Sequence, residues 1–501
     1  MNSLLVIAPV LLPFAAGVLL LALRDLPMPV RRATALAASL LQIAVAVTLL
    51  SAVAGGEILV YRLGNWPAPW GIVLVADRLA AWLVLTTALL APFALLHTGG
   101  GVDRAGRHFH VLFQMQLFGL SGAFLTGDLF NLFVFFEVLL MASYGLLLHG
   151  GGPERARAGL HYVILNLLGS SVFLLAAGLC YGVLGTLNFA DLALKFAAVP
   201  AENLALARAA GLLLLAVFGL KAALLPLHLW LPNAYAAASP PVAALFAIMT
   251  KLGVYAILRC HTLLFGADAG PLAGLFDPWL LPVALATLLF GMLGALAARR
   301  LARQAAWLVI ASVGTLLGAL ALGTPQGLAA GLYYLPHSTF AAAALFLLVA
   351  PLARRRAASG DSFSPDVDLS HAGFWGGLFF IVAVLIGGLP PLSGFLGKFM
   401  LLRASGGHAA QFWIWGVVLV GALFGMIALS RAGSLIFFRT RPGAVEDMPP
   451  MWWEWMPVAG LVALGVGLTV FAGAAFEFAE ATAVQLLRPA DYIAAVLGGV
   501  R

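Results

Sequence analysis

Four lysines occur in the chain, and three of them, Lys221, Lys251 and Lys398, lie inside or at the edge of apolar runs long enough to span a bilayer. A charged side chain at the centre of a bilayer costs about 2.5 to 3.5 kcal/mol on insertion scales, so an ionisable group there usually has a function. One carboxylate matches these amines: Glu137, near the middle of the apolar run from 129 to 148. Such groups can bind and release protons, and the pattern indicates proton or cation movement across a membrane.

Glu137 has no polar neighbour within four residues on either side, so its partner must come from another helix, and we choose Lys221. Burial disfavours the charged form of each group and pairing favours it, so a movable proton or ion nearby can switch either one. The alternative is a static ion pair between helices, which often contributes little more than an apolar substitute would.

Lys251 lies near the middle of its apolar run, with Tyr255 one helical turn further on. A buried lysine changes its protonation readily, so a neutral amine here can pass a proton along bound water. The alternative is that the side chain snorkels to a membrane interface, which is a long reach from the middle of a span. We therefore interpret Lys251 as a proton relay.

His337 lies in a polar patch, residues 333 to 339, inside a long apolar run. Histidine suits proton transfer near neutral pH, but a lone membrane histidine is often a hydrogen-bonded packing residue, and both interpretations stay open. His228, beside a proline-rich segment, is a further candidate for the same role. The hydroxyl residues of the apolar runs are interpreted as helix contacts that could hold water; they are Ser170, Ser171, Ser312 and Thr315.

The composition determines the class of protein. Hydrophobic residues make up 63% of the 501 residues and charged residues 9%, and the mean hydropathy is +1.04. Soluble domains carry about 25% charged residues. We therefore predict an all-α polytopic membrane protein in which residues 1–501 form a single integral membrane domain within the lipid bilayer.

Several other classes of site are disfavoured. The net charge of +7 comes from arginines scattered over short loops, so no basic stripe indicates a nucleic-acid partner. Cys180 and Cys260 have neither the spacing nor the histidine neighbours of a metal site, so we expect no metal and no cofactor. The glycine-rich segment 99–101 lacks the lysine of a nucleotide-binding loop.

Apolar runs of about 20 residues predict fourteen membrane-spanning helices, because each is long enough to cross the hydrocarbon core. The first run lacks a basic segment and a convincing cleavage site, which predicts a retained helix and not a signal peptide. The predicted spans are 4–23, 34–53, 79–98, 109–126, 129–148, 161–185, 209–227, 241–259, 279–298, 305–322, 327–352, 373–402, 411–430 and 456–478.

The basic residues of the connections are unevenly distributed. Connections after odd-numbered spans carry 16 arginines, whereas those after even-numbered spans and the C-terminal tail carry eight basic residues, Arg259 among them. Cytoplasmic loops are enriched in lysine and arginine. The distribution predicts a multi-pass protein of the cell (inner) membrane with both termini outside, in agreement with an even number of spans.

Two segments break the helical pattern: 224–241, with four prolines, and 387–397, with Pro390, Pro391 and several glycines. A break frees backbone groups that lipid cannot satisfy, so it must be buried in protein or line a wet cavity. Paired interruptions in two halves of a chain indicate an inverted-repeat transporter with its path at the breaks. Lys221 and Lys398 lie beside these two segments, which supports a role in transport.

Three motifs resemble the proton-translocating membrane subunits shared by respiratory complex I and the multisubunit Mrp cation/proton antiporters. They are GDLFNLFVFFEV at 127–138, GLK at 219–221 with PLHLWLP at 226–232, and LPPLSGFLGK at 389–398. The likeness covers essentially the whole chain. Within that superfamily, YYLPHST at 333–339 and the lysine that ends the third motif are most similar to the D subunit of Mrp antiporters.

The resemblance implies fourteen helices with two inverted five-helix repeats, at 109–260 and 279–430, two broken helices, and flanking helices in 1–98 and 456–478. It implies that other antiporter subunits form a hetero-oligomeric complex with this chain. It also implies a role for each candidate: Glu137 and Lys221 form the coupling pair, Lys251 is the central relay, His337 continues it, and Lys398 is the proton group on the exit side. Related complex I subunits often carry a lysine shortly after the histidine, where this chain has alanines at 341–344.

The expected function is that of a secondary transporter subunit, not an enzyme, in which proton inflow drives efflux of a monovalent cation, Na⁺ or K⁺. One alternative is the proton-pumping membrane subunit of NADH-quinone oxidoreductase (complex I) or a related hydrogenase. A second alternative is a silent scaffold whose buried charges only set helix register. Within single spans, no cluster of oxygen-bearing side chains indicates a sodium site.

Overall fold

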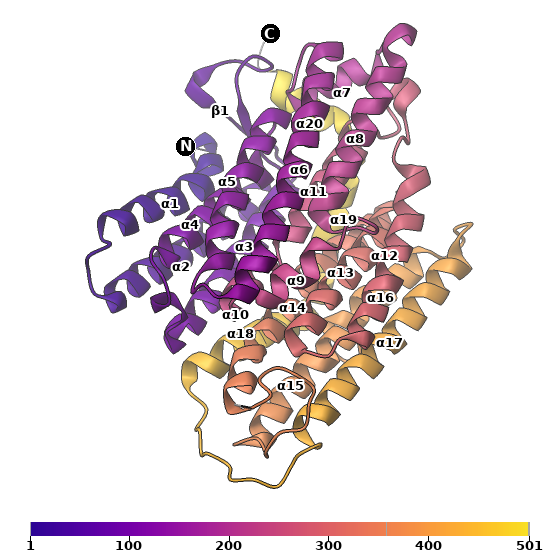
Figure 1. Cartoon of the computed structure of the whole chain (residues 1–501). Coiled ribbons are helices and arrows are strands. Elements are labelled where there is room, and N and C mark those ends of the chain that lie inside the picture. Colours follow the sequence, from indigo (N-terminus) through magenta and orange to yellow (C-terminus); the bar gives the residue numbers. More distant parts are fainter. Residues whose placement is uncertain (1, 357, 499–501) are drawn as a thin grey trace.

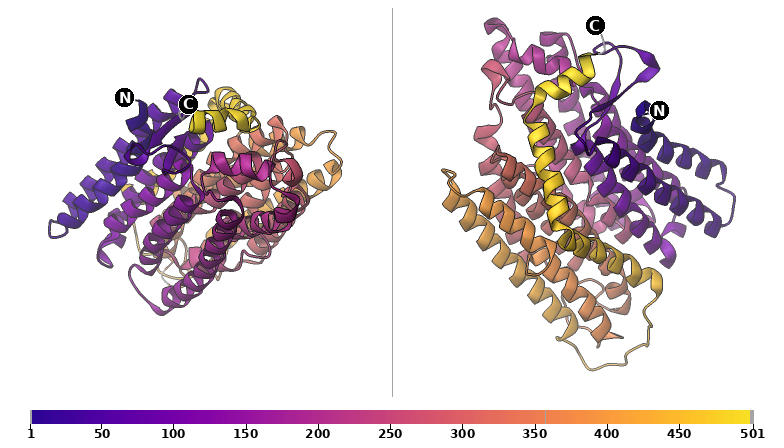
Figure 2. Two further views of the ribbon diagram at one scale, coloured as in Figure 1. Left: turned by 90° about the horizontal axis from the view of Figure 1, so that it is seen from above. Right: turned by 180° about the vertical axis from the view of Figure 1, so that it is seen from behind.

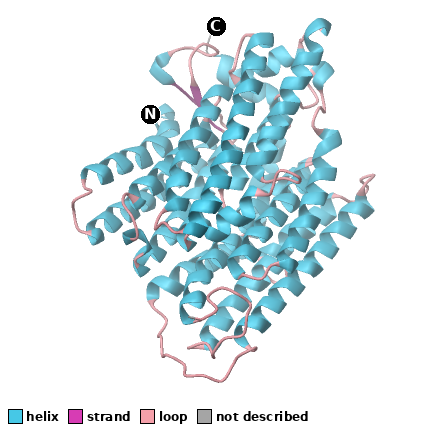
Figure 3. Cartoon of the chain, viewed as in Figure 1, coloured by secondary structure: helices cyan, strands magenta, loops and turns pink. Residues whose placement is uncertain are grey.

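The computed structural model describes residues 2–356 and 358–498, and helices dominate it (Figure 3). The N-terminal group begins with α1 (Asn2–Ala22) and α2 (Met28–Val53), followed by α3 (Arg78–Leu96). Between α2 and α3, β1 (Leu59–Arg62) and β2 (Val73–Ala76) form an antiparallel pair in which Leu59 lies opposite Ala76. This hairpin was not predicted from the sequence.

The first predicted repeat region contains eight helices. They are α4 (Phe109–Leu125), α5 (Leu129–Leu148), α6 (Pro153–Leu184), α7 (Phe189–Ala197), α8 (Leu204–Ala222), α9 (Trp230–Ala237), α10 (Pro240–Phe246) and α11 (Met249–Leu263). Short polar residues mark several helix starts: the Asp128 carboxylate accepts from the Asn131 backbone N–H, and the Asn188 side chain caps α7 in the same way.

The second predicted repeat region and the C-terminal segment follow. They contain α12 (Asp277–Ala297), α13 (Leu301–Leu320), α14 (Pro325–Arg355), α15 (Ala372–Gly387), α16 (Ser393–Ala404), α17 (Gln411–Phe437), α18 (Trp452–Val470), α19 (Ala472–Leu486) and α20 (Pro489–Leu497). Short 3₁₀ turns lie at Leu63–Asn65, His97–Gly100, Val102–Arg104, Ala201–Asn203 and Gly270–Leu272.

The predicted spans are found in their predicted order. Within the described residues, twelve helices are long and apolar enough to cross a membrane, and two shorter apolar helices, α4 and α15, take the remaining predicted positions. Three helical segments are the most enclosed: the apolar window of α10–α11 is 100% buried, that of α14 is 94% buried and that of α13 is 89% buried, against 28% for α2. The molecule is therefore a multi-pass membrane bundle whose centre is formed by α10, α11, α13 and α14.

The first helices and the helices of the second predicted repeat region lie at opposite edges of the bundle. Figure 1 shows α1 and α2 at one edge and α17 at the opposite edge, and the two further views in Figure 2 agree. The last helices, α18 to α20, pass across the bundle between these edges (Figure 2). Helix α20 lies at the end of the bundle that carries β1 (Figure 1).

Both predicted breaks are present. The span predicted at 209–227 stops at Ala222, and Ala223 adopts the left-handed conformation with a φ of 58°. The chain then runs without regular α-helix past Pro226 until α9 begins at Trp230. In the second half, α15 ends at Gly387, and Gly388 is left-handed with a φ of 75°. Each helix thus ends in a left-handed residue, a common helix terminus, and a proline follows.

The predicted boundary at Arg259 was also wrong. The span predicted at 241–259 extends to Leu263, and Arg259 lies buried inside α11 instead of in a connection. The reason is a partner far away in the sequence: the Arg259 guanidinium donates to both carboxylate oxygens of Asp77, with N–O distances of 2.6 and 2.9 Å. A buried arginine is tolerated in a helix when its charge is paired and its donors are bonded.

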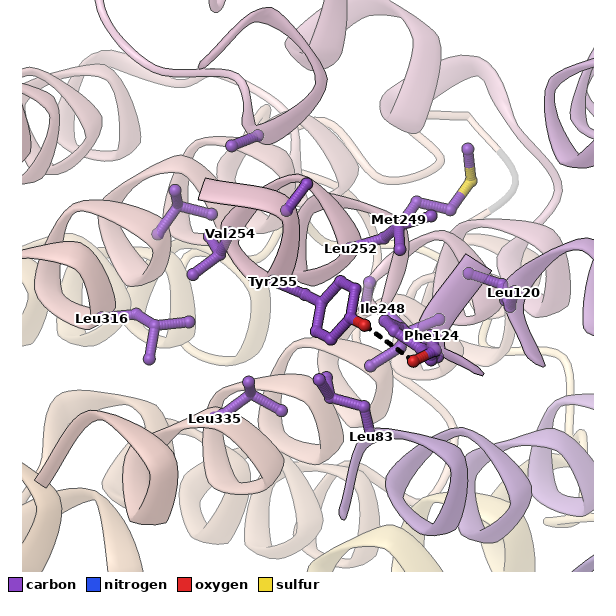
Figure 4. Close-up of a cluster of buried hydrophobic side chains, with 14 of the residues drawn as sticks. Leu83, Leu120, Phe124, Ile248, Met249, Leu252, Val254, Tyr255, Leu316 and Leu335 are labelled. Atoms are coloured by element: carbon purple, nitrogen blue, oxygen red, sulfur yellow. Dashed lines mark hydrogen bonds between the residues drawn. The ribbon is translucent and has the colours of Figure 1, made fainter. Parts of the chain in front are cut away.

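Tyr255 shows how α11 is held at the centre. Its hydroxyl donates to the backbone carbonyl of Phe124 over 2.8 Å, and its ring lies among apolar side chains that include Leu83 and Leu335 (Figure 4). Four segments of the chain meet there, namely α3, α4, α11 and α14. The helix that carries Lys251 is therefore fixed on all sides.

Candidate functional site

Lys221 lies in the last turn of α8, immediately before the first break, and is 5% exposed. Its ammonium donates to three oxygens of α6: the Asn166 carbonyl at 3.3 Å, the Asn166 side-chain oxygen at 3.4 Å and the Ser170 hydroxyl at 3.4 Å. The Phe136 ring of α5 covers the group, with its centroid 5.8 Å from the nitrogen. The end of α8 therefore directs this amine at one face of α6.

Glu137 of α5 and Lys221 are joined through a serine. The Ser170 hydroxyl donates to a Glu137 carboxylate oxygen and accepts from Lys221. Among the described ion pairs there is no direct one between Glu137 and Lys221, so the two predicted partners share Ser170 between them. Ser170 and Asn166 were missed as site residues, although they lie one turn apart on α6 and so share a face.

Lys251 of α11 is fully buried, and its amine donates to the Ser312 hydroxyl of α13 over 3.2 Å. Two residues further on, Gly253 packs against the end of α8. A Cβ at Gly253 would lie 2.8 Å from the Cα of Ala222, closer than real Cβ contacts. Glycine therefore lets the helix that carries Lys251 approach the residue next to Lys221, although within the described residues no hydrogen bond joins the two amines.

A small cavity lies beyond Ser312. Its volume is about 20 Å³, and its lining includes Ser312, Tyr334, His337, Ser338 and Ala341. A cavity needs roughly 10 to 15 Å³ on this scale to hold one water molecule, with polar partners around it. The alanines after His337 leave this space open. The site thus has room for a water molecule between the partner of Lys251 and the histidine.

His337 of α14 contacts the second break. Its Nδ1 atom and the Ser393 hydroxyl, at the start of α16, are 3.0 Å apart. Gly394 makes this approach feasible, because a Cβ there would lie 2.9 Å from the Cε1 atom of His337. Ser393 lies inside the third motif, but only the packing of α14 against α16 shows that it faces the histidine. It is a site residue that sequence reasoning missed.

Lys398 of α16 reaches back to the end of α15. Its ammonium donates to the Gly387 carbonyl at 2.8 Å and the Ile386 carbonyl at 3.4 Å. The last carbonyls of a helix have no intrahelical donor and carry partial negative charge. The amine therefore occupies the C-terminal end of the interrupted helix.

His228 is set apart from this series. It follows the first break, is 4% exposed, and packs against Trp307 and Phe290 with ring centroids 5.4 and 6.2 Å away. Its Nδ1 atom is buried without a hydrogen-bond partner among the described residues. The structure thus brings Glu137 and Lys221 together as one pair. It also brings Lys251 towards His337, and it leaves His228 outside both groups.

No metal centre is found in the described part of the chain: no three His, Cys, Asp or Glu side chains lie close enough to hold an ion. Cys180 and Cys260 are both buried and free. What the site offers is a series of amines, hydroxyls, an imidazole and a carboxylate. Such groups exchange protons, and their chemistry needs no bound cofactor.

The sequence of this chain is similar to those of known proteins. Residues 126–425 match the model of the family described as NADH:quinone oxidoreductase/Mrp antiporter, transmembrane. The D subunit of a probable K(+)/H(+) antiporter from Rhizobium meliloti (strain 1021) is 40% identical, over 99% of this chain and 98% of its own length. The D subunit of the Na(+)/H(+) antiporter from Bacillus subtilis (strain 168) is 36% identical, over 98% and 99% respectively.

Two solved structures contain a chain with the same fold. A chain of the Mrp complex from Dietzia sp. DQ12-45-1b superposes with a TM-score of 0.87 at 28% identity, covering 99% of both chains. A chain of respiratory complex I from Thermus thermophilus with bound NADH gives a TM-score of 0.79 at 27% identity, over 96% of this chain and 99% of that one. The predicted fold class is confirmed, and the chain belongs to the NADH:quinone oxidoreductase/Mrp antiporter family of transmembrane proteins.

Proposed function

We propose that this chain is the D-type subunit of a multisubunit antiporter in which proton inflow drives the efflux of a monovalent cation, Na⁺ or K⁺. Glu137, Lys221, Lys251, His337 and Lys398 carry the protons. Two curated relatives, 40% and 36% identical, are named as the D subunits of a K(+)/H(+) and a Na(+)/H(+) antiporter. As a subunit, the chain works inside a hetero-oligomeric complex of the cell membrane.

The observation that carries this proposal is the partner of two of the three buried lysines. Lys221 contacts Ser170, and Lys251 contacts Ser312, both through hydroxyls. Each hydroxyl donates its own hydrogen elsewhere and accepts from the amine. A neutral amine still carries N–H donors, so either contact can persist when the amine loses its proton. A chain of such contacts can be protonated and deprotonated repeatedly without repacking.

The breaks support the same function. We propose that residues 109–260 and 279–430 form two inverted five-helix repeats, flanked by helices in 1–98 and 456–478. Lys221 then ends the interrupted helix of the first repeat, and Lys398 faces the end of the interrupted helix of the second. Transporters built from inverted repeats place their ion path at such interruptions.

The experiment is an assay in everted vesicles that carry the complete antiporter complex, energised by respiration and challenged with NaCl, KCl or choline chloride. We expect collapse of the proton gradient with Na⁺ or K⁺ but not with choline. Glu137→Ala and Lys221→Ala should abolish the response while the complex still assembles. Full activity in either variant would contradict the assigned coupling pair.

Other outcomes of the same assay identify the alternatives. If the chain instead pumps protons in a redox enzyme, the vesicles would show no collapse of the proton gradient with Na⁺ or K⁺. A scaffold whose charges only set helix register would keep its wild-type response in both variants.

A further inference from the structure

A large cavity lies at the end of the bundle where α6 and α13 begin and α14 ends. Its volume is about 560 Å³, and Tyr235 of α9 and Ala243 of α10 form one of its walls. Its charged lining residues are two arginines and two carboxylates, namely Glu154, Arg155, Arg300 and Asp361. All four belong to predicted connections that are rich in arginine. The distribution of basic residues therefore puts this cavity on the inner side of the membrane.

The lining of this large cavity suits water. The segment between α9 and α10 belongs to the first break, and a break in a membrane helix must be buried in protein or line a wet cavity. Ser239 lies between two lining residues, Ala238 and Pro240, and its buried hydroxyl has no hydrogen-bond partner among the described residues. Buried hydroxyls usually bond to protein or to water.

The large cavity and the small cavity beside Ser312 lie along the same groove, between α13 and α14. On α13, Ala302 lines the large cavity and Ala305 lines the small one. On α14, Phe346 lines the large cavity and Ala342 the small one. Residues three or four apart share a helix face and are separated by about 5 Å along the axis. The two cavities are therefore about one helical turn apart.

From this arrangement we propose that the groove between α13 and α14 is the inner, water-filled access of the central proton relay. Protons leave the relay at Ser312 and His337, pass Phe346 and cross the large cavity. Arg300 closes the mouth of this cavity. The inference rests on the proposed function and extends it, because it gives the relay an opening to the inner side that does not pass through Lys398.

Phe346 is the constriction between the two cavities. Its side chain is 1% exposed, and its ring centroid lies 6.2 Å from that of Tyr235. The neighbouring positions along the groove are alanines: Ala302, Ala305 and Ala342. Because these neighbours are small, a change of rotamer at one ring is enough to connect the two cavities.

Arg300 lies across the mouth of the large cavity. Its Nε atom donates to the Asp361 carboxylate over 2.8 Å, and a terminal nitrogen donates to the Glu154 carboxylate. Glu154 lies in the first turn of α6 and Arg300 directly precedes α13, so this contact joins the two predicted repeats. The Arg300 and Glu154 side chains are 43% and 64% exposed. Exposed ion pairs contribute little to stability, so this contact can break and re-form.

The test measures whether water reaches the groove from the inner side. Ala302→Cys places a thiol in the large cavity, and Ala306→Cys places one at a fully buried position of the same helix that lines neither cavity. Everted vesicles with the complete complex are treated with MTSET, a small thiol reagent of permanent positive charge. We expect Ala302→Cys to react about tenfold faster or more, because buried thiols are inert. The unaltered chain, whose Cys180 and Cys260 are buried, gives the background.

Two further measurements check the side and the wall. In intact spheroplasts the reagent meets the outer side, so Ala302→Cys should be protected there. Ala350→Cys, at a partly exposed position of α14 that lines the same cavity, should react like Ala302→Cys in everted vesicles. It repeats the test from the other wall if Ala302→Cys prevents assembly.

Modification also links the groove to transport. MTSET leaves a fixed positive charge on Ala302→Cys inside the large cavity. We expect cation-dependent proton movement to fall by about tenfold or more, because this charge repels protons in a groove of low dielectric constant. Vesicles with Ala306→Cys, treated in the same way, should keep the rate that they had before treatment.

Glu154→Gln tests the closure of the mouth. It removes one of the two ion pairs of Arg300 at an exposed side chain. Combined with Ala302→Cys, it should raise the labelling rate by about threefold, the scale of one exposed ion pair. An unchanged rate would mean that Arg300 does not close the mouth.

The outcomes separate this inference from the proposed function. If Ala302→Cys reacts no faster than Ala306→Cys, reacts from the outer side, or transports equally well after modification, the groove is not the inner access. Antiport by the wild type would remain intact in each of these cases. If wild-type vesicles show no cation-dependent proton movement, the proposed function itself is wrong, and the groove then has no relay to serve.

Discussion

Two of the three buried lysines are paired with a serine hydroxyl on a neighbouring helix, Ser170 for Lys221 and Ser312 for Lys251. A direct lysine–carboxylate contact would favour the charged form and hold the proton in place. A serine hydroxyl is uncharged and accepts a hydrogen bond from either form of the amine, because a neutral amine still carries N–H donors. The serine partners therefore favour the proposed proton relay over a structural ion pair.

Lys251→Arg tests whether Lys251 releases its proton. Arginine keeps the positive charge but stays protonated in proteins, so we expect cation-dependent proton movement in everted vesicles to fall by about a hundredfold, the scale of losing one proton-transfer group. Lys195→Arg is the matched control, because the Lys195 side chain is 42% exposed and pairs with Asp191. Activity near that of the wild type would mean that Lys251 acts only as a fixed charge.

Ser393→Ala tests the connection between His337 and the second break. It removes the hydroxyl that lies 3.0 Å from His337 Nδ1. We expect proton movement about fivefold slower, in line with a net hydrogen-bond contribution of about 1 kcal/mol, and partial recovery in Ser393→Thr. Ser405→Ala, which removes a buried hydroxyl that donates to the Leu402 carbonyl and accepts from the Trp415 indole N–H of α17, should have no effect on proton movement. An equal loss in both alanine variants would assign the effect to packing.

At the level of elements, the breaks could be predicted because proline and glycine act locally. A single proline does not suffice, since Pro92 and Pro336 lie inside α3 and α14. At each break the proline stands in a short segment with further prolines or glycines. The hydroxyl partners could not be predicted, since Ser170 meets Lys221 only through the packing of α6 against α8. The predicted end of α11 was wrong for a similar reason: the partner of Arg259 is Asp77, 182 residues earlier in the chain.

The N-terminal end of α2 is tied to the connection between α3 and α4. The Asp103 carboxylate, fully buried, accepts from Arg32 at 2.6 Å and lies 3.0 Å from His110 Nε2. Burial alone raises the pKa of Asp103, but the hydrogen bonds from Arg32 and His110 outweigh it and hold the pKa well below its usual range. This contact therefore stabilises the fold fully above the ordinary aspartate pKa of about 3.9, and the stabilisation is lost only as the pH falls below that value.

Asp103→Asn should accordingly lower the free energy of unfolding by about 2 kcal/mol near neutral pH. This is less than a fully buried broken pair would cost, because the Arg32 side chain is 26% exposed. Thermal unfolding of the purified complex, followed by tryptophan fluorescence, should show the same loss of stability at every pH between about pH 5 and pH 8. The reason is that the pKa of Asp103 lies below this window in both the folded and the unfolded chain. Asp25→Asn, at a side chain that is 93% exposed, is the control. A deficit that grows steadily with pH would indicate a different titrating group.

At the scale of the whole molecule, the candidate groups are spread across the bundle and not gathered in one pocket. Lys221 and Glu137 lie on α8 and α5, whereas Lys398 lies on α16 in the second half of the chain. The enclosed helices α11, α13 and α14 stand between them and carry Lys251, Ser312 and His337. The proposed proton route along these groups therefore runs across the bundle, and the orientation of the chain decides which side of the membrane each connection faces.

The distribution of basic residues predicts that orientation, because cytoplasmic connections collect arginine. We expect the connection between α2 and α3, which carries β1 and β2, outside and the connection between α17 and α18 inside, with both termini outside. Glu57→Cys and Glu446→Cys place an exposed thiol in each connection, while Cys180 and Cys260 are buried and should stay unreactive. A membrane-impermeant maleimide should label the first variant in intact spheroplasts and the second only in everted vesicles, with the unaltered chain as the background. The reverse labelling pattern would mean that the chain has the opposite orientation in the membrane. Protons would then reach Lys221 from the opposite side.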